Sequence, residues 1–178
     1  MRFVTIVGNP KPQSRTLTVA LQAAAVIGET AGLAGGGQVI DLSGLARRLL
    51  LPEPSAAVED ALELAMGADL LLVASPTYKG TYTGLLKVFL DRLPYKGLQD
   101  TTALPLLLMN SPLHALAVEV HLRPLLVELG ASVPAPGLAV LESELDRLDR
   151  VLSRWTSQVI EDFGRRVPGR APALSGLQ

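Results

Sequence analysis

The sequence contains no cysteine and only two histidines, His114 and His121, among its 178 residues. The absence of thiols excludes disulfides, zinc–thiolate sites, iron–sulfur clusters and thiol catalysis. Two histidines also argue against a histidine-rich metal site, and no Ser-His-Asp arrangement can be composed around them. We therefore expect no bound metal and no catalytic triad.

An excess of charge and a long apolar run are missing as well. The formal net charge is -1, so nothing indicates binding to nucleic acid or to an anionic membrane surface. No apolar run approaches the roughly 20 residues of a membrane-spanning helix. The first apolar run, residues 2–7, ends at Gly8, too soon for a signal peptide. These features predict a cytoplasmic protein.

The composition, with 48% hydrophobic and 19% charged residues, suits an α/β domain whose sheet is covered on both faces. Apolar runs predict strands, and apolar residues at helical spacing predict helices between them. A polar connection is expected over 43–54, and a flexible tail over 164–178, after a single domain over 1–163. The expected strands are 2–7, 39–42, 70–74, 103–109 and one within 131–140; the expected helices follow Ser14 and Ser55 or span 84–93, 115–129 and 145–163.

This alternation predicts a five-stranded parallel sheet with helices on both faces, in the flavodoxin-like strand order 2-1-3-4-5. In that order the first and third strands are neighbours, and ligands bind beyond their carboxyl ends. Two unusual loops follow these two strands. Pro105 is unfavourable inside the strand expected over 103–109, because proline fits the middle of a sheet badly. Pro124 is expected to distort the helix over 115–129.

The first loop, Gly8-Asn9-Pro10-Lys11-Pro12-Gln13-Ser14-Arg15-Thr16, has the features of a phosphate site. Lys11 and Arg15 carry positive charge, Ser14 and Thr16 carry hydroxyls, and a helix begins here with unpaired N–H groups. The alternative is that Ser14 only caps the helix and the cations are solvated. Neither GxGxxG nor a Gly-Lys-Ser/Thr P-loop is present, so a mononucleotide-like phosphate fits best.

The second loop, Ser75-Pro76-Thr77-Tyr78-Lys79-Gly80-Thr81-Tyr82-Thr83-Gly84, suits a planar heterocycle such as flavin. Backbone N–H groups at residues 77–80 are available for the ring edge, and Tyr78 for its face. All three tyrosines, Tyr78, Tyr82 and Tyr95, lie in or just after this loop. Alternatively, Tyr78 and Tyr82 pack against neighbouring loops or a subunit.

Other polar residues are weaker candidates. Lys87 and Asp91 are spaced as an ordinary surface pair on a helix. His114 follows the fourth strand and either touches the rim of a cofactor or simply starts a helix. His121 is expected at the surface or at an interface.

The two loops, with Tyr82-Thr83-Gly84-Leu85-Leu86-Lys87, Asp91, Leu93-Pro94 and the run 114–124, resemble a known family over residues 1–163. It is the flavodoxin-like NADPH-dependent FMN reductases, the reductase partners of two-component alkanesulfonate and sulfone monooxygenases. The resemblance implies a homodimer or homotetramer, in which helix 114–129 packs against its copies, sometimes through a π-helical insertion. The tyrosine that some relatives insert there is absent, so a π-bulge would place Val120 or His121 in its position.

The resemblance also implies the cofactor contacts. It places the FMN phosphate in the first loop, the ribityl chain and isoalloxazine in the second, and further contacts after the fourth strand. Two departures stand out: Asn9 replaces a usual serine, and Asn110-Ser111-Pro112 stands where relatives commonly have Gly-Gly. The implied contacts are Asn9, Lys11, Ser14, Arg15, Thr16, Pro76, Thr77, Tyr78, Lys79, Gly80, Asn110, Ser111 and His114.

The function implied is hydride transfer from NADPH or NADH to FMN, which supplies reduced flavin to a partner monooxygenase. No catalytic side chain is required, because the cofactor carries the chemistry. Two alternatives remain open at this point. One is a flavoprotein with bound FMN that reduces quinones, azo compounds or metal oxyanions, and the other is a non-enzymatic flavin-binding protein.

Overall fold

Five parallel strands form the central sheet of the computed structural model, which describes residues 1–33 and 37–166. Their order across the sheet is 2-1-3-4-5, as predicted. The strands are β1 (Phe3–Val7), β2 (Gln38–Asp41), β3 (Leu70–Pro76), β4 (Thr102–Met109) and β5 (Leu138–Leu141). The helices are α1 (Arg15–Thr30), α2 (Ala46–Leu49), α3 (Ala56–Met66), α4 (Gly84–Leu90), α5 (Arg123–Glu128) and α6 (Leu148–Arg166).

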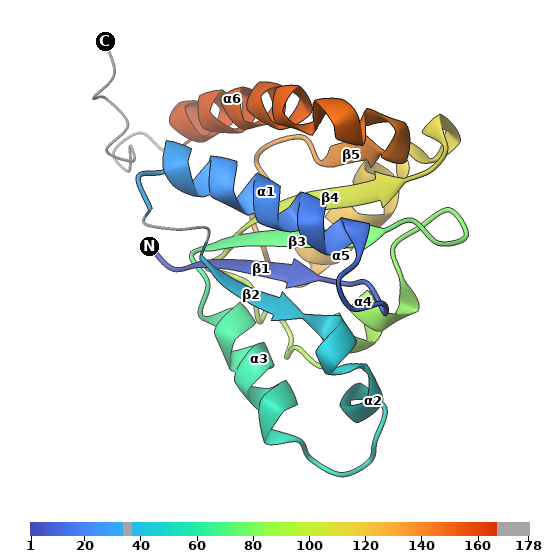
Figure 1. Ribbon diagram of the computed structural model, residues 1–178. Coiled ribbons are helices and arrows are strands. Elements are labelled where there is room, and N and C mark those ends of the chain that lie inside the picture. Colours follow the sequence, from blue (N-terminus) through green and yellow to red (C-terminus); the bar gives the residue numbers. More distant parts are fainter. Residues whose placement is uncertain (34–36, 167–178) are drawn as a thin grey trace.

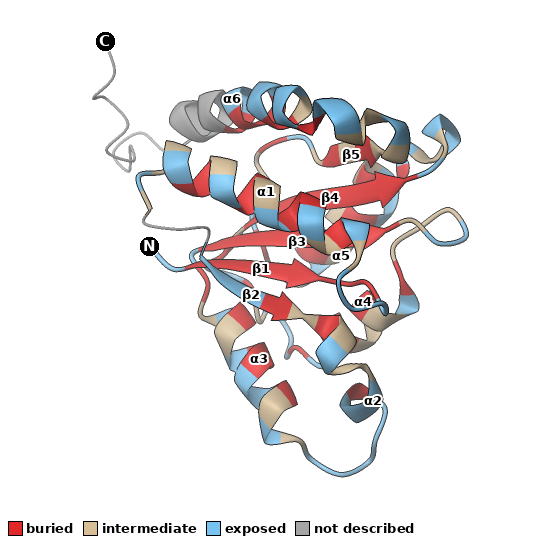
Figure 2. Ribbon diagram, in the orientation of Figure 1, coloured by how far each residue is buried: buried red, intermediate tan, exposed pale blue. Residues whose placement is uncertain are grey.

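Helices cover both faces of the sheet, because successive residues of each strand face opposite sides and both sides are apolar. β1 and β3 are buried along their whole lengths (Figure 2). One core cluster joins α1 and α6 to the sheet, and a second joins α2, α3, α4 and α5 to the opposite face (Figure 1). The predicted parallel sheet with helices on both faces is therefore confirmed.

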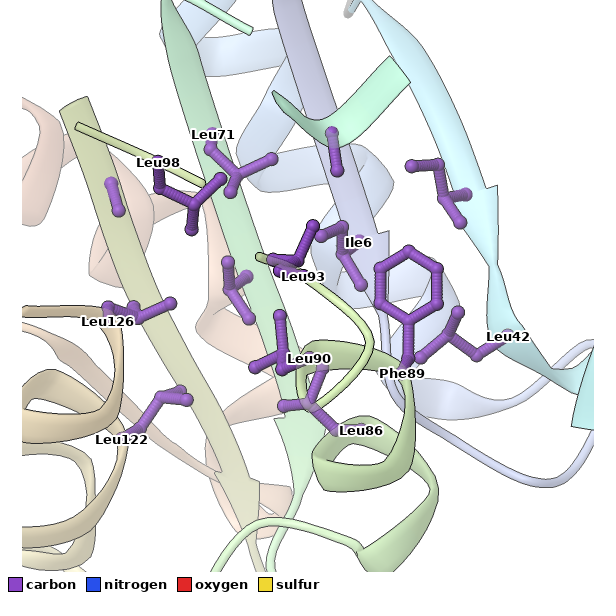
Figure 3. Packing of buried hydrophobic residues seen from close by; sticks show 14 of the residues in the cluster. Ile6, Leu42, Leu71, Leu86, Phe89, Leu90, Leu93, Leu98, Leu122 and Leu126 are labelled. Atoms are coloured by element: carbon purple, nitrogen blue, oxygen red, sulfur yellow. The ribbon is translucent and has the colours of Figure 1, made fainter. Parts of the chain in front are cut away.

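The second cluster fixes the position of α4 beneath the carboxyl ends of β1 and β3. Leu86, Phe89 and Leu90 of α4 are fully buried in one cluster with Ile6 and Leu71 of the sheet, and the Phe89 ring lies beside Ile6 (Figure 3). Burying side chains of this size stabilises the fold by about 1.5–3 kcal/mol each. The second loop, which leads into α4, therefore has a firmly anchored end.

The segment 43–54 is more ordered than the sequence suggests. It holds the end of a 3₁₀ helix (Leu42–Gly44) and then α2, and the Asp41 side chain accepts from the Ser43 N–H at 3.0 Å at its start. Leu42 and Leu49 are buried and anchor the segment in the core. The expectation of a plain polar connection was wrong because of these two anchors.

Several expected boundaries also moved. β3 continues through Ser75 and Pro76, which the sequence assigned to the loop. α4 ends at Leu90 instead of near residue 93. Ser55 occupies the N-cap position of α3, but its side chain makes no capping hydrogen bond. The shifts are of the size that helix and strand ends commonly show.

Pro105 lies inside β4 without interrupting it. The Ala103 N–H donates to the Ser132 carbonyl on the β5 side at 2.8 Å, and the alternation of a strand turns the Pro105 nitrogen to the same side. The β4–β5 ladder begins only at Leu106 and Leu138. The proline nitrogen therefore lies before the first paired residue of that ladder, and its missing N–H costs no hydrogen bond between β4 and β5.

The helix expected over 115–129 is divided. A π-helix spans Val118–Leu122 and α5 follows directly. Pro124 lies in the first turn of α5, where proline is tolerated, so the expected distortion at Pro124 is replaced by a π-helix just before it. Val120 and His121 both lie in the π-helix and are exposed, which agrees with the positions predicted for a bulge.

The π-helix is tied to the segment before β5 by one acidic and one basic side chain. Arg123 pairs with Glu119 and donates to the carbonyls of Val133 and Ala135, both at 2.6 Å. The Gly137 N–H donates to Glu119 at 2.6 Å. Burial acts to raise the pKa of the Glu119 carboxyl, but its bonds to Arg123 and Gly137 outweigh this and lower that pKa below its usual value.

The last helix, α6, follows a 3₁₀ helix over Glu142–Arg147 and packs against α1. Trp155 is buried there, and its indole N–H donates to the Pro136 carbonyl at 2.8 Å. α6 extends to Arg166, beyond the domain end expected at 163. Residues 167–178 of the expected tail lie outside the described residues, so the tail stays a prediction.

Candidate functional site

The loops that follow β1, β3 and β4 gather at the carboxyl edge of the sheet, where the strand arrowheads end in Figure 1. The first two loops are directly connected. The Gly8 N–H donates to the Ala74 carbonyl at 2.7 Å, and the Gly8 carbonyl accepts from Thr83 Oγ1 at 2.5 Å. A Cβ on Gly8 would lie 2.7 Å from Leu86 Cβ, so only glycine lets α4 approach this closely.

Thr83 and Ser75 hold the second loop. Thr83 Oγ1 also accepts from the Leu86 N–H at 3.1 Å, which makes Thr83 the N-cap of α4. The Thr83 N–H donates to Ser75 Oγ at 3.0 Å, and Ser75 Oγ donates to the Pro76 carbonyl. Both side chains are buried. Their role in the site is structural, and the sequence reasoning did not assign it.

The Asn9 side chain makes two hydrogen bonds within the first loop. Its Nδ2 donates to Thr16 Oγ1 at 3.0 Å, and its Oδ1 accepts from the Lys11 N–H at 2.9 Å. Asn9 and Thr16 are buried. The residue that departs from the family pattern is therefore the brace of this loop, and a serine is too short to bridge the same two groups in this way.

The start of α1 presents several backbone donors together. Gln13 has a φ of 52°, a left-handed conformation that is uncommon for a residue with a side chain. Within the described part of the chain, the N–H groups of residues 13–16 have no hydrogen-bond acceptor. Such a run at a helix N-terminus forms an anion-binding concavity, which the helix dipole reinforces. Ser14 Oγ meanwhile caps the helix by accepting from the Leu17 N–H at 3.2 Å.

The two cations of the first loop differ in their surroundings. Lys11 is exposed. The Arg15 guanidinium pairs with Glu142, with 2.7 Å between Nη1 and Oε2. Glu142 immediately follows β5 and lies 127 positions away in the sequence, so no local pattern reveals this ion pair.

The second loop is largely bonded to itself. Residues 78–81 form a tight turn in which the Tyr78 N–H donates to the Thr81 carbonyl at 2.8 Å and the Thr81 N–H donates back at 3.3 Å. Lys79 and Gly80 have φ values of 54° and 85°, as a type I′ turn requires. The Thr77 N–H donates to the Leu108 carbonyl at 2.7 Å.

Of the N–H groups expected to face a ring edge, two are therefore used internally, at Thr77 and Tyr78. Among the described residues, those of Lys79 and Gly80 have no acceptor. Tyr78 is 44% exposed, so its ring is accessible to a ligand, while Tyr82 is partly buried and packs against the core cluster on the α4 face and not against a neighbouring loop alone. Pro76 is buried at the end of β3.

The third loop, after β4, contributes Asn110, Ser111 and His114. Asn110 is exposed, and Ser111 Oγ accepts from the Leu113 N–H at 3.3 Å to begin a 3₁₀ helix over Pro112–His114. His114 therefore ends a short helix instead of opening one. Its Nδ1 is buried without a partner in the described structure, as is Thr77 Oγ1 in the second loop. A buried polar atom without a partner costs about 1–3 kcal/mol, which a hydrogen-bonding ligand can offset.

Outside the loops, Lys87 and Asp91 form the expected surface pair at 2.5 Å. The hydrogen bond to the Asp91 carboxylate raises the pKa of Lys87. In residues 1–33 and 37–166 no three acidic or histidine side chains are grouped to hold a metal, and no helix is long and apolar enough to cross a membrane.

This arrangement fits a ligand that has both a phosphate and a planar polar ring. The free N–H run at the start of α1 fits the phosphate, and the Lys79 and Gly80 N–H groups with the exposed Tyr78 ring fit the planar part. The sequence located both loops. It did not reveal the Thr83 link between them, the left-handed Gln13 or the Glu142 carboxylate.

Comparisons with known proteins agree with this reading. The family model for NADPH-dependent FMN reductases matches residues 1–146. An FMN reductase (NADPH) of Pseudomonas aeruginosa is 32% identical over 98% of this chain and 92% of its own length. The NADH-dependent FMN reductase SfnF of Pseudomonas fluorescens is 33% identical over 99% and 92%. The crystal structure of an apo NADH:FMN oxidoreductase (EmoB) superposes with a TM-score of 0.82 at 31% identity, covering 96% of this chain and 92% of the other.

Proposed function

The chain belongs to the family of NADPH-dependent FMN reductases, and from this we propose that it transfers hydride from NADPH or NADH to FMN. Bound FMN supplies the redox chemistry, since its ring accepts the hydride. The protein's own residues bind and orient. The N–H run of residues 13–16, with Lys11 and Arg15, holds the phosphate, and the loop over 76–80 holds the ring.

The observation that carries this proposal is the row of unpaired N–H groups at the start of α1 beside two cations. A phosphate satisfies these donors without any change of fold. Asn110, Ser111 and His114 line the third side, and His114 Nδ1 is a group that a polar ring edge would satisfy. The site needs no general base, because hydride moves between the two cofactors.

We also propose that the protein assembles as a homodimer or homotetramer through the helical segment 113–127. Four apolar side chains there are more than half exposed, from 53% for Val127 to 89% for Leu113. They lie three, four and seven residues apart on one short segment, and so many exposed apolar side chains close together in the chain are unusual for a surface that stays in water. The four residues are Leu113, Leu116, Val120 and Val127.

The reduced FMN is proposed to pass to a partner monooxygenase in the cytoplasm. The support is the resemblance to reductases of two-component systems and the similarity to the NADH-dependent FMN reductase SfnF. A reductase that supplies flavin to another enzyme must release it, whereas a self-contained flavoprotein keeps it.

The test is FMN binding combined with steady-state kinetics on the purified protein. We expect FMN to bind, NADPH or NADH to be oxidised only when FMN is present, and the kinetics to show FMN as a released substrate. Ping-pong kinetics with flavin retained after dialysis would favour the flavoprotein that reduces quinones, azo compounds or metal oxyanions. Binding without oxidation of either nicotinamide would identify a non-enzymatic flavin-binding protein.

A further inference from the structure

A carboxylate lies beside the end of the first loop, where α1 begins. Glu142 Oε2 is 2.7 Å from Arg15 Nη1, and Arg15 is the first residue of α1. The sheet delivers this carboxylate, because Glu142 directly follows the last residue of β5. Both side chains are within reach of solvent, with 68% of Arg15 and 35% of Glu142 exposed.

A phosphate bound to the N–H groups of residues 13–16 would meet this ion pair. Its negative charge must share the Arg15 guanidinium with Glu142 or displace it, and repulsion between phosphate and carboxylate remains in either case. A guanidinium has five N–H donors, so sharing is geometrically allowed. Sharing does not remove the repulsion, which weakens binding of the phosphate group alone.

We propose that Glu142 is a built-in competitor for the flavin phosphate, and that it keeps FMN exchangeable. The inference rests on the proposed function and adds to it a residue that sets FMN affinity. Glu142 acts through Arg15 and through its own charge, so it is a positioning residue and not a catalytic one. Its effect is specific to the phosphate, because in the described part of the chain Arg15 and Glu142 bond to each other and not to the second loop, where the ring is proposed to lie.

The test compares FMN with riboflavin, which has the same ring and no phosphate. In Glu142→Gln the side chain keeps its size and loses its charge. We expect FMN to bind roughly five- to tenfold more tightly and to dissociate correspondingly more slowly, from the removal of one close like charge near a partly exposed site. Riboflavin affinity should not change.

Two further variants separate this effect from a general one. Glu59→Gln breaks another exposed ion pair of the same length, 2.7 Å to Arg92, away from the loops, and should leave FMN affinity unaltered. Arg15→Ala should weaken FMN binding, and adding Glu142→Gln to it should yield a smaller gain than in the wild type, because the two residues act together. Circular dichroism checks that each variant is folded.

The outcomes separate the inference from the function on which it rests. Tighter FMN binding with unchanged riboflavin binding supports the competitor. Equal or weaker FMN binding by Glu142→Gln, in a protein that still reduces FMN, overturns the competitor alone. Equal gains for FMN and riboflavin also overturn it. Absence of FMN binding in both the wild type and Glu142→Gln overturns the competitor and the reductase together.

Discussion

The two loops that follow β1 and β3 look alike in sequence and differ in what they do with their backbone. The loop over 8–16 leaves its N–H groups at residues 13–16 without acceptors in the described structure, whereas the loop over 75–84 spends those of Thr77, Tyr78 and Thr81 on itself and on β4. Free donors indicate a surface that binds, and satisfied donors indicate a surface that keeps its shape. The first loop is thus suited to binding an anion. The second is suited to holding the Tyr78 ring and the Lys79 and Gly80 N–H groups in fixed positions for a planar ligand.

The difference revises the importance of each loop. From the sequence, all four backbone N–H groups at residues 77–80 of the second loop were expected to be available for the ring edge. In the structure its contribution narrows to the Lys79 and Gly80 N–H groups and the Tyr78 ring. Specificity for the phosphate and specificity for the ring should therefore be separable by mutation.

The largest effect is expected at Thr83, a residue of the second loop whose hydroxyl is bonded to Gly8 of the first. Thr83→Val keeps the shape of the side chain but leaves the Gly8 carbonyl and the Leu86 N–H without their partner. We expect a loss of about 2–4 kcal/mol in the free energy of unfolding, since each abandoned buried group costs energy. Urea denaturation measures it, and FMN and riboflavin affinity should fall together.

Thr18→Val is the matched control, because Thr18 is exposed and its hydroxyl makes only a 3.5 Å contact with the Ser14 carbonyl. It should change stability by less than about 0.5 kcal/mol. A comparable loss in both variants would mean that the link between the loops is not the cause.

The next effect is expected at Gly80, and it tests the shape of the second loop. Gly80→Val forces a β-branched residue into a φ of 85° and should cost about 1–3 kcal/mol. A Cβ there meets open space, so strain in the backbone is the whole cause. FMN and riboflavin should both bind less tightly. Gly84→Ala, also in open space but without positive φ, should show neither effect.

A smaller effect separates the loops by ligand. Lys11→Ala should weaken FMN binding by roughly tenfold and leave riboflavin binding unchanged, because it removes one charge-assisted contact to a phosphate. Lys79→Ala should change the two affinities by the same factor. Isothermal titration with both ligands measures this, and selective loss of FMN binding by Lys79→Ala would reverse the assignment of the two loops.

The smallest effect is a gain. Lys79→Asn places an Asn-Gly pair in the type I′ turn, and asparagine tolerates the left-handed conformation better than lysine. We expect about 0.5–1 kcal/mol of added stability by thermal denaturation. Lys96, with the same φ of 54° in front of Gly97, provides the comparison: Lys96→Asn should give a similar gain without touching the site. No gain at either position would show that these turns are not strained.

Most of the fold was predictable because its signals are local. The apolar runs over residues 2–7 and 70–74 read directly as strands, which the structure confirms with small shifts at their ends, and Ser14 predicted a helix start that the structure also confirms. The helix inside 43–54 was missed because α2 has only four residues, too few to show a repeating pattern of apolar positions. Pro105 argued against a strand that exists, since its position relative to the β5 ladder cannot be read from the sequence.

For the site, the residue types were predictable and their connections were not. The sequence singled out Lys11, Arg15 and the loop over 75–84. It could not show which N–H groups find an acceptor, because acceptors such as the Leu108 carbonyl lie in distant strands. The Arg15–Glu142 pair is a product of strand order alone, since it joins the start of α1 to the end of β5.

Pro105 also has a consequence for folding fidelity. A shift of β5 toward the amino end of β4 would bring a strand opposite the proline nitrogen, where no donor exists, so this misalignment is penalised. A slip of one residue displaces whatever follows β5 by about 3.3 Å, enough to separate Glu142 from Arg15. Pro105 therefore favours the correct register of β5 against β4. The same register keeps Glu142 beside Arg15, where the proposed phosphate binds.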